Sequence, residues 1–136
     1  MKKILLASIT ASTLLYAHSN ANAAWKELGA NELMVVYVDL ETVQTQGEKT
    51  QILSMLDFKK PGVNPNNKQP VSSIIGLNEY DCPTVSYRPI AFKEFSGSKG
   101  TGKVVSDNNT PDSKYEPIEN GSWSAGVFNS VCKLNK

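Results

Sequence analysis

The sequence predicts a small α+β domain, in which an antiparallel sheet of about six strands carries one C-terminal helix packed on it and one disulfide bond. Three observations support this fold class. Short runs rich in Val, Ile and Tyr follow one another with no helical pattern between them, which favours antiparallel pairing. Helical spacing of apolar residues occurs only near the C-terminus. The two cysteines follow a segment typical of exported proteins, where an even number of cysteines indicates a disulfide bond.

The expected strands are short and are separated by turn-forming residues. We expect them at residues 25–28, 32–39, 49–58, 71–80, 84–95 and 103–105. Gly47, with Glu48 after it, can turn the second strand into the third. Residues 59–70 and 107–114 are rich in Pro and Asn, so both stretches are expected to be loops.

Helical periodicity marks the C-terminal end. Four apolar residues recur at i, i+4, i+8 and i+11 and share one helix face: Trp123, Val127, Val131 and Leu134. Ser122 or Ser124 can supply the N-cap. Gly126 and the β-branched valines make this a weak helix, so it needs packing against the sheet and a tether at Cys132.

The first 23 residues are typical of a secretory signal peptide. Two lysines precede an apolar segment at residues 4–16, and Ala-Asn-Ala at 21–23 has the small residues of a signal-peptidase site. We place cleavage between Ala23 and Ala24, with a weaker second pattern ending at Ala21. As a helix the apolar segment would span about 20 Å, less than the roughly 30 Å core of a bilayer, so no stable membrane anchor is expected. The protein is predicted to be exported to the periplasm, the cell surface or the medium.

Cleavage would leave one domain, residues 24–136, whose composition disfavours several classes of function. Its 113 residues carry 12 Lys and Arg against 13 Asp and Glu, so a nucleic-acid partner is not expected. The single histidine, His18, leaves with the signal. A domain without histidine cannot run a Ser-His-Asp or Cys-His mechanism or build a His-containing zinc or iron site. We therefore predict a protein that is not an enzyme and has no cofactor and no catalytic metal.

The two cysteines, Cys82 and Cys132, are expected to form the disulfide bond. They lie 50 residues apart and so form no CxxC redox motif. Closing a loop of this length would stabilise the fold by about 4 kcal/mol on the chain-entropy estimate. A reactive or metal-binding thiol is the alternative.

Paired carboxylates are the first candidates for chemistry. Asp39 and Glu41 stand two residues apart, as do Glu79 and Asp81, so on a strand each pair would share a face. Such pairs could hold calcium or act as acid and base. Because neither pair has the spacing of a calcium loop, we expect solvated strand ends.

A glycine-rich segment at residues 96–103 matches a phosphate-binding loop only in part. Gly97 and Gly102 have the P-loop spacing and Lys103 follows, but Val104 occupies the position of the metal-binding Ser or Thr. We therefore expect a flexible glycine hairpin.

Aromatic and lysine side chains are the candidates for protein binding. Five aromatic residues could form an exposed surface, although rings on alternating strands usually belong to a core: Tyr80, Tyr87, Phe92, Phe95 and Tyr115. Lys59, Lys60 and Lys68 lie on a proline-stiffened stretch, which would lose little chain entropy on docking. These three lysines are the predicted binding residues, ahead of the glycine-rich segment.

Several of these residues occur in an order that resembles a known family. They are Trp25, YVDLETV at 37–43, Ser73, EYDC at 79–82 with Arg88, F-S-x-x-x-G-x-G-K-V-V at 95–105, GS at 121–122 and VC at 131–132. Over nearly all of the mature chain the sequence resembles the surface-adhesin protein E family of Gram-negative bacteria. The resemblance implies an antiparallel sheet with a C-terminal helix, a Cys82–Cys132 disulfide, surface display and binding to host extracellular-matrix proteins. It transfers no binding residue.

Three functions remain open at this point. The first is an exported, non-enzymatic, adhesin-like protein whose partner is a host matrix protein. The second is a soluble periplasmic protein that acts as an envelope factor or enzyme inhibitor on an envelope protein. The third is a histidine-free enzyme that uses carboxylates such as Asp39, Asp57 or Glu79. A pocket with convergent carboxylates would favour the third.

Overall fold

The computed structural model describes residues 23–133. Residues 1–22 of the predicted 23-residue signal peptide, His18 among them, and the last residue of the predicted helix stripe, Leu134, lie outside this range. No helix among the described residues is long and apolar enough to cross a bilayer.

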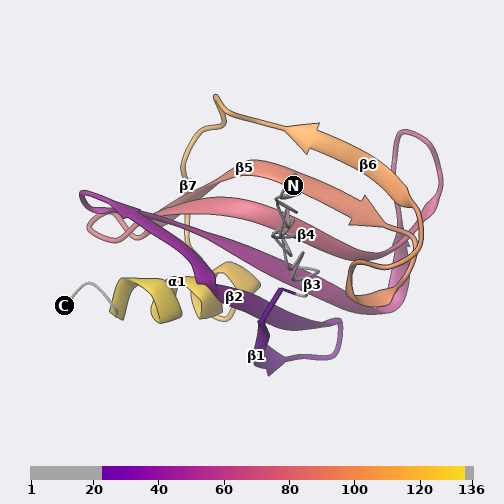
Figure 1. The fold of residues 1–136 in the computed structure, drawn as a ribbon, viewed down its shortest axis with the longest axis horizontal. Coiled ribbons are helices and arrows are strands. Elements are labelled where there is room, and N and C mark those ends of the chain that lie inside the picture. Colours follow the sequence, from indigo (N-terminus) through magenta and orange to yellow (C-terminus); the bar gives the residue numbers. More distant parts are fainter. Residues whose placement is uncertain (1–22, 134–136) are drawn as a thin grey trace, which may run out of the picture.

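The predicted fold class is confirmed: an antiparallel sheet carries a single C-terminal helix (Figure 1). The sheet order is β1-β2-β3-β4-β5-β6, so each of these strands pairs with its neighbour in sequence, and β7 pairs with β5. The elements are β1 (Trp25–Ala30), β2 (Met34–Gln46), β3 (Lys49–Val63), β4 (Pro70–Asp81), β5 (Ser86–Phe95), the 3₁₀ turn η1 (Ser98–Gly100), β6 (Val104–Asn109), β7 (Glu116–Pro117) and α1 (Trp123–Cys132).

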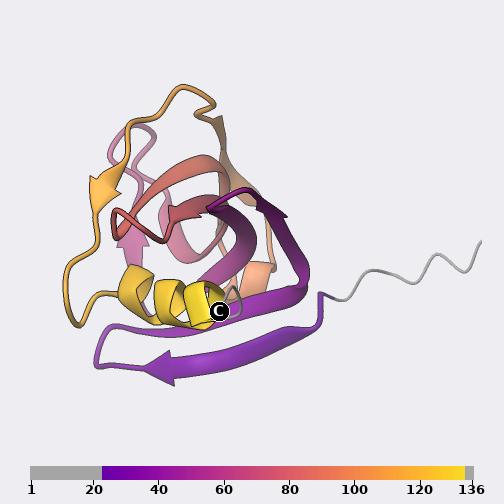
Figure 2. The ribbon, with the colours of Figure 1, turned by 90° about the vertical axis from the view of Figure 1, so that its left-hand side faces the viewer.

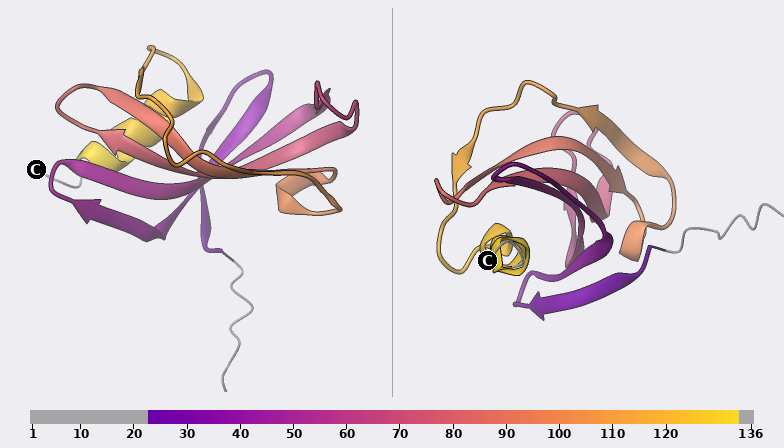
Figure 3. Two further views of the ribbon diagram at one scale, coloured as in Figure 1. Left: turned by 90° about the horizontal axis from the view of Figure 1, so that it is seen from above. Right: turned by 60° about the vertical axis from the view of Figure 1, so that its left-hand side comes forward.

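The sheet twists strongly and curls around the helix, so that α1 lies in its concavity (Figures 2 and 3). Residues of β2 and β3 that face each other across the ladder, such as Val36 and Leu56, share this concave face. They pack with Ile52, Tyr80 and the helix residue Val127 in one core. The β2 and β3 strands can bend this far because the ladder is interrupted by irregular segments within each of them.

Two expected loops are partly strand. β3 continues through residues 59–63, where Gly62 pairs with Val71 and Val63 pairs with Pro70. Pro61 fits because it lies where the β3–β4 register shifts, so its missing N–H breaks no ladder hydrogen bond. β6 likewise runs to Asn109, into the second expected loop.

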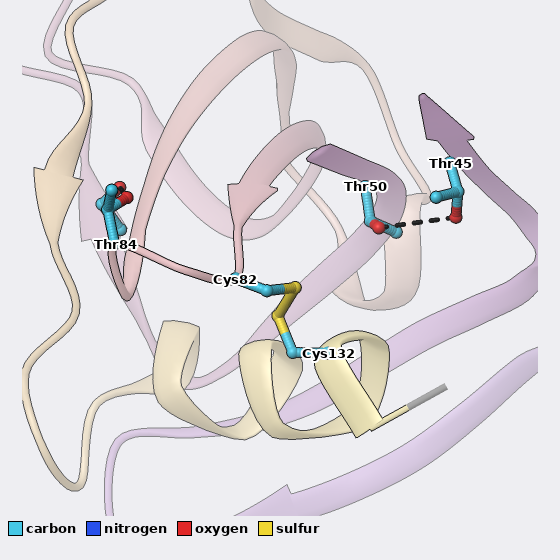
Figure 4. The surroundings of a disulfide bond; sticks show 6 residues. Thr45, Thr50, Cys82, Thr84 and Cys132 are labelled. Carbon is cyan, nitrogen blue, oxygen red and sulfur yellow. Dashed lines mark hydrogen bonds between the residues drawn. A yellow bond between two sulfur atoms is a disulfide. The ribbon is translucent and has the colours of Figure 1, made fainter. Parts of the chain in front are cut away.

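The helix begins at the predicted cap. The Ser122 hydroxyl accepts a hydrogen bond from the Ala125 N–H at 3.2 Å. Val127 and Val131 are fully buried, which confirms the predicted apolar face for the described residues. At the other end, Cys132 is joined to Cys82, just past β4, with 5.6 Å between the two Cα atoms (Figure 4). This bond confirms the predicted pairing of the cysteines and contradicts the alternative of a reactive or metal-binding thiol.

We predict that the loss of this bond destabilises the whole domain. The bond closes a 50-residue loop and holds the end of a weak helix, so Cys132→Ser should lower the free energy of unfolding by about 2–5 kcal/mol. Urea denaturation of the wild type and the variant measures this difference. Thiol labelling of the unreduced, denatured wild type should find no free cysteine, and two labelled thiols per chain would contradict the pairing.

Candidate functional site

Glu79, a candidate catalytic carboxylate, lies in a closed hydrogen-bond network. Its Oε2 accepts from Gln51 Nε2 at 2.9 Å, and its Oε1 accepts from Arg88 Nε at 3.0 Å and from the Tyr115 hydroxyl. Burial would raise the pKa of this side chain, but the hydrogen bonds from Gln51, Tyr115 and Arg88 outweigh it and lower the pKa to about 2. A carboxylate this acidic and this fully bonded is a poor general base near neutral pH, so the network is structural.

The same network fixes the connection between β6 and β7. Two cations lie against the Tyr115 ring, with Lys49 Nζ 4.9 Å and Arg88 Cζ 5.5 Å from its centroid. Arg88 Nη1 also donates to the Pro111 carbonyl at 2.6 Å. The connection is therefore held against β3, β4 and β5, and it delivers Glu116 of β7 to a position opposite Tyr87 of β5.

Two other candidate carboxylates, Asp39 and Asp57, also accept hydrogen bonds from backbone N–H groups. Asp39 is buried and its Oδ1 accepts from the Glu41 N–H at 3.1 Å, so the expected solvated strand end is wrong for Asp39. Asp57 Oδ1 accepts from the Lys99 N–H at 2.9 Å. Within residues 23–133, no three Asp, Glu, His or Cys side chains group closely enough to hold a metal ion.

The glycine-rich segment is a tightly packed turn, not the flexible hairpin that the sequence predicted. It folds back onto the convex face, where the Ser73 hydroxyl donates to the Gly97 carbonyl at 2.7 Å and accepts from the Gly100 N–H at 2.8 Å. Gly100 has φ +73°, and a Cβ there would lie 2.6 Å from Ile75 Cδ1. Gly100 allows this close approach to the sheet, whereas a Cβ at Gly97 or Gly102 would meet Thr101 or Ser96 within the segment itself. The segment leads into β6, whereas a phosphate loop would lead into a helix.

The five aromatic residues do not form one exposed surface. Tyr80 is fully buried and stacks on Tyr87 with ring centroids 5.8 Å apart, while Tyr115 belongs to the Glu79 network on the other face. Phe92 lies on the concave face opposite Gly76, and Phe95 pairs with Ser73. Tyr80 belongs to the buried core and Tyr87 packs against it, as predicted. The other three rings are half-buried and lie outside this core cluster, and Phe92 lines a cleft.

That cleft lies next to the N-terminal end of α1, at Trp123, where the helix no longer covers the concave face. We call it the aromatic cleft; it has a volume of about 270 Å³ and is lined by Ser54, Leu56, Ile74, Gly76, Asn78, Tyr87, Pro89, Phe92, Glu116 and Trp123. Gly76 lies at the bottom of the cleft and leaves space there, because a side chain at this position would project toward Phe92, with its Cβ 3.3 Å from the Cβ of Phe92. The lining is mainly apolar, with Glu116 as its one charged side chain.

A second hollow lies where the β1–β2 turn meets β3. This tip groove, of about 460 Å³, is lined by Glu32, Leu33, Met34, Phe58, Lys60 and Gly62. The Asn31 side chain shapes the turn by accepting from the N–H groups of Leu33 and Met34 at 2.8 and 2.9 Å. The turn leaves the Leu33 side chain 69% exposed.

The three predicted binding lysines divide between this groove and the next turn. Lys60 lines the tip groove, and Lys59 is joined to it because its N–H donates to the Leu33 carbonyl at 2.9 Å. Lys68 lies in the β3–β4 turn, outside the groove lining, with its N–H bonded to the Asn64 carbonyl at 2.9 Å. Sequence reasoning missed Leu33, whose only signal was an apolar side chain two residues after a turn-forming Asn.

Comparison with known proteins finds one matching family and solved structures with a similar fold. A family model described as surface-adhesin protein E matches residues 25–133. One solved structure of Haemophilus influenzae protein E is 12% identical, with 81% of this chain and 84% of that chain covered and a TM-score of 0.59. Protein E from non-typeable Haemophilus influenzae is also 12% identical, with 85% and 79% covered and a TM-score of 0.58. No curated protein matches the sequence. At this identity the structures show a shared fold.

The turn at η1 predicts opposite effects for two glycine-to-alanine changes. Gly100→Ala puts a side chain at positive φ against Ile75 and should lower the free energy of unfolding by about 1–3 kcal/mol. Gly126→Ala is the matched control, because open space surrounds this helical glycine, and alanine should raise stability by about 0.5–1 kcal/mol. Urea denaturation measures both changes. Equal stability of Gly100→Ala and wild type would contradict a packed turn.

The Glu79 network predicts acid sensitivity with a defined sign. The pKa is lower in the folded state than its ordinary value of 4.5, so ionised Glu79 stabilises the fold above about pH 4.5. This contribution, on the order of 2 kcal/mol, is lost as the pH falls toward 2. Glu79→Gln should flatten the dependence of unfolding free energy on pH between 4.5 and 2. Glu48→Gln, in the exposed β2–β3 turn, is the control and should keep the wild-type slope.

Proposed function

The chain belongs to the surface-adhesin protein E family, and from this membership we propose that it is an exported, non-enzymatic adhesin that binds a host extracellular-matrix protein. The Cys82–Cys132 bond supports export, because such bonds persist in oxidising compartments outside the cytosol. The predicted signal peptide, cleaved between Ala23 and Ala24, would provide the route.

The observation that carries the proposed binding function is the exposed apolar surface of the tip groove. Leu33 is 69% exposed and Val63, next to the groove residue Gly62, is 63% exposed. Apolar side chains gathered in a hollow on the surface are typical of protein interaction sites. Lys59 and Lys60 lie beside them on β3, and Glu32 is the one acidic residue in the groove lining. This arrangement fits a partner segment that presents an apolar side chain next to acidic residues.

The strand position of Lys59 and Lys60 strengthens their part in this proposal. Both were expected on a loop, but β3 and the bond from Lys59 to Leu33 already hold their backbone in place. Less chain entropy is therefore lost on binding than a loop would lose. Lys68 lies outside the groove lining, so we assign it no direct contact there and keep it only as a neighbouring charge.

The test compares groove variants with a control of equal charge change. Lys59→Ala with Lys60→Ala, and separately Leu33→Ala, should each weaken binding to immobilised matrix proteins by roughly threefold to thirtyfold, without changing stability. Lys26→Ala with Lys133→Ala removes two exposed lysines elsewhere and should bind as the wild type does. Binding is measured by surface plasmon resonance across a salt series, which should weaken the wild type more than the lysine variant.

Two results would overturn the proposal at different levels. Wild-type affinity of both groove variants would remove the tip groove as the binding surface. Failure of the wild type to bind any of a panel of purified matrix proteins, with the protein found in the periplasm on fractionation, would favour the envelope factor or enzyme inhibitor.

A further inference from the structure

The aromatic cleft combines three rings with a carboxylate. Tyr87, Phe92 and Trp123 line it together with Glu116, while Leu56 and Ile74 supply aliphatic surface. Rings and a carboxylate around one hollow are the chemistry that binds a cation carried on an apolar stem.

A second, polar hollow adjoins this cleft through shared residues. It has a volume of about 250 Å³ and is lined by Tyr87, Glu116, Pro117, Glu119, Ser122, Trp123 and Ser124. Tyr87, Glu116 and Trp123 line both hollows. An apolar cavity thus opens beside one that holds two carboxylates. No lysine or arginine lines either of these two hollows in the described part of the chain.

The shared residues are held in place before any ligand arrives. The Tyr87 and Trp123 rings meet edge to face with centroids 5.5 Å apart. The Tyr87 hydroxyl donates to Glu116 Oε2 at 3.4 Å, and the β5–β7 pairing sets these two residues opposite each other. Burial, with a smaller contribution from Glu116, raises the pKa of Tyr87, so its hydroxyl stays protonated at neutral pH and can donate to Glu116.

We propose that the aromatic cleft binds a lysine or arginine side chain presented by a protein partner. The aliphatic stem would lie along Leu56, Ile74 and Phe92, and the cationic head would reach Glu116 beside the rings of Tyr87 and Trp123. The N-terminus of α1 contributes about half a positive charge here, which two full carboxylate charges outweigh. The site is separate from the tip groove and does not depend on matrix binding.

The charge pattern excludes the other simple occupants of such a cleft. An anionic side chain would meet Glu116 and Glu119 with no basic partner in the lining. A purely aliphatic side chain would fill the apolar part and leave the adjoining carboxylates without a partner. A basic side chain satisfies both parts, because long basic residues bury their stems and keep their charged ends near water.

The test is NMR titration of ¹⁵N-labelled exported protein with capped tripeptides. The probes are acetyl-Gly-Arg-Gly-amide, its lysine, norleucine and glutamate counterparts, and choline. The Trp123 indole N–H should shift with the arginine and lysine peptides, with Kd on the order of 1–10 mM for one side chain. The Trp25 indole, which lines neither hollow, is the internal control and should not shift. Norleucine has the stem without the charge and should bind at least threefold more weakly.

Two variants separate binding from folding. Glu116→Gln keeps the shape of an exposed side chain and should weaken the arginine peptide about threefold to tenfold, while Glu41→Gln, an exposed carboxylate elsewhere, should change nothing. Phe92→Leu keeps an apolar wall but removes one ring and should weaken binding of the norleucine and arginine peptides alike. Equal binding of the norleucine and arginine peptides, unchanged binding by Glu116→Gln, or no Trp123 shift at 20 mM peptide would overturn the proposal. Tighter binding of choline than of either basic peptide would overturn it in favour of a small ammonium ligand.

Discussion

A helix that could not persist alone is held in a curled sheet by one covalent bond, and the rest of the concave face is arranged around it. α1 has only 10 residues, with a glycine and two valines among them, and isolated helices of that length are marginal in water. Burial of Val127 and Val131 supplies the packing, and the Cys82–Cys132 bond keeps the C-terminal end against β4. Since the bond fixes where α1 ends, the helix length fixes where Trp123 lies and hence where the aromatic cleft opens.

The convex face is covered by irregular segments that polar contacts hold in place. Ser73 and Asp57 bind the backbone of the η1 turn, and Glu79 with Arg88 binds the connection before β7. A buried carboxylate strengthens a fold only when both of its oxygens have hydrogen-bond partners. Both oxygens of Glu79 accept hydrogen bonds. From the sequence, the acidic and glycine-rich motifs suggested catalysis or phosphate binding. In the structure they hold the covering segments against the convex face of the sheet.

The sequence was sufficient for the fold class because strand periodicity, the helix stripe and the cysteine pair are local or composition-level signals. Strand ends were predicted less well. Pro61 signals a loop in isolation, but where the register shifts it costs no ladder bond, and β3 runs on to Val63. The binding surfaces were beyond reach for a different reason. Tyr87, Glu116 and Trp123 are separated by 29 and 7 residues, and only the β5–β7 pairing and the helix start bring them together.

The near-zero net charge of the chain conceals a separation of charge along one face. Leu56 and Phe58 stand two apart on β3 and so share the concave side, one lining the aromatic cleft and the other the tip groove. Glu116 lines the aromatic cleft and Glu119 lines the polar hollow beside it, while Lys60 lines the tip groove with Lys59 next to it on β3. A partner that crosses this face would meet acid next to rings and then base next to exposed aliphatic side chains. Charges of opposite sign held apart in this way set the orientation of a partner, although their sum provides little long-range attraction.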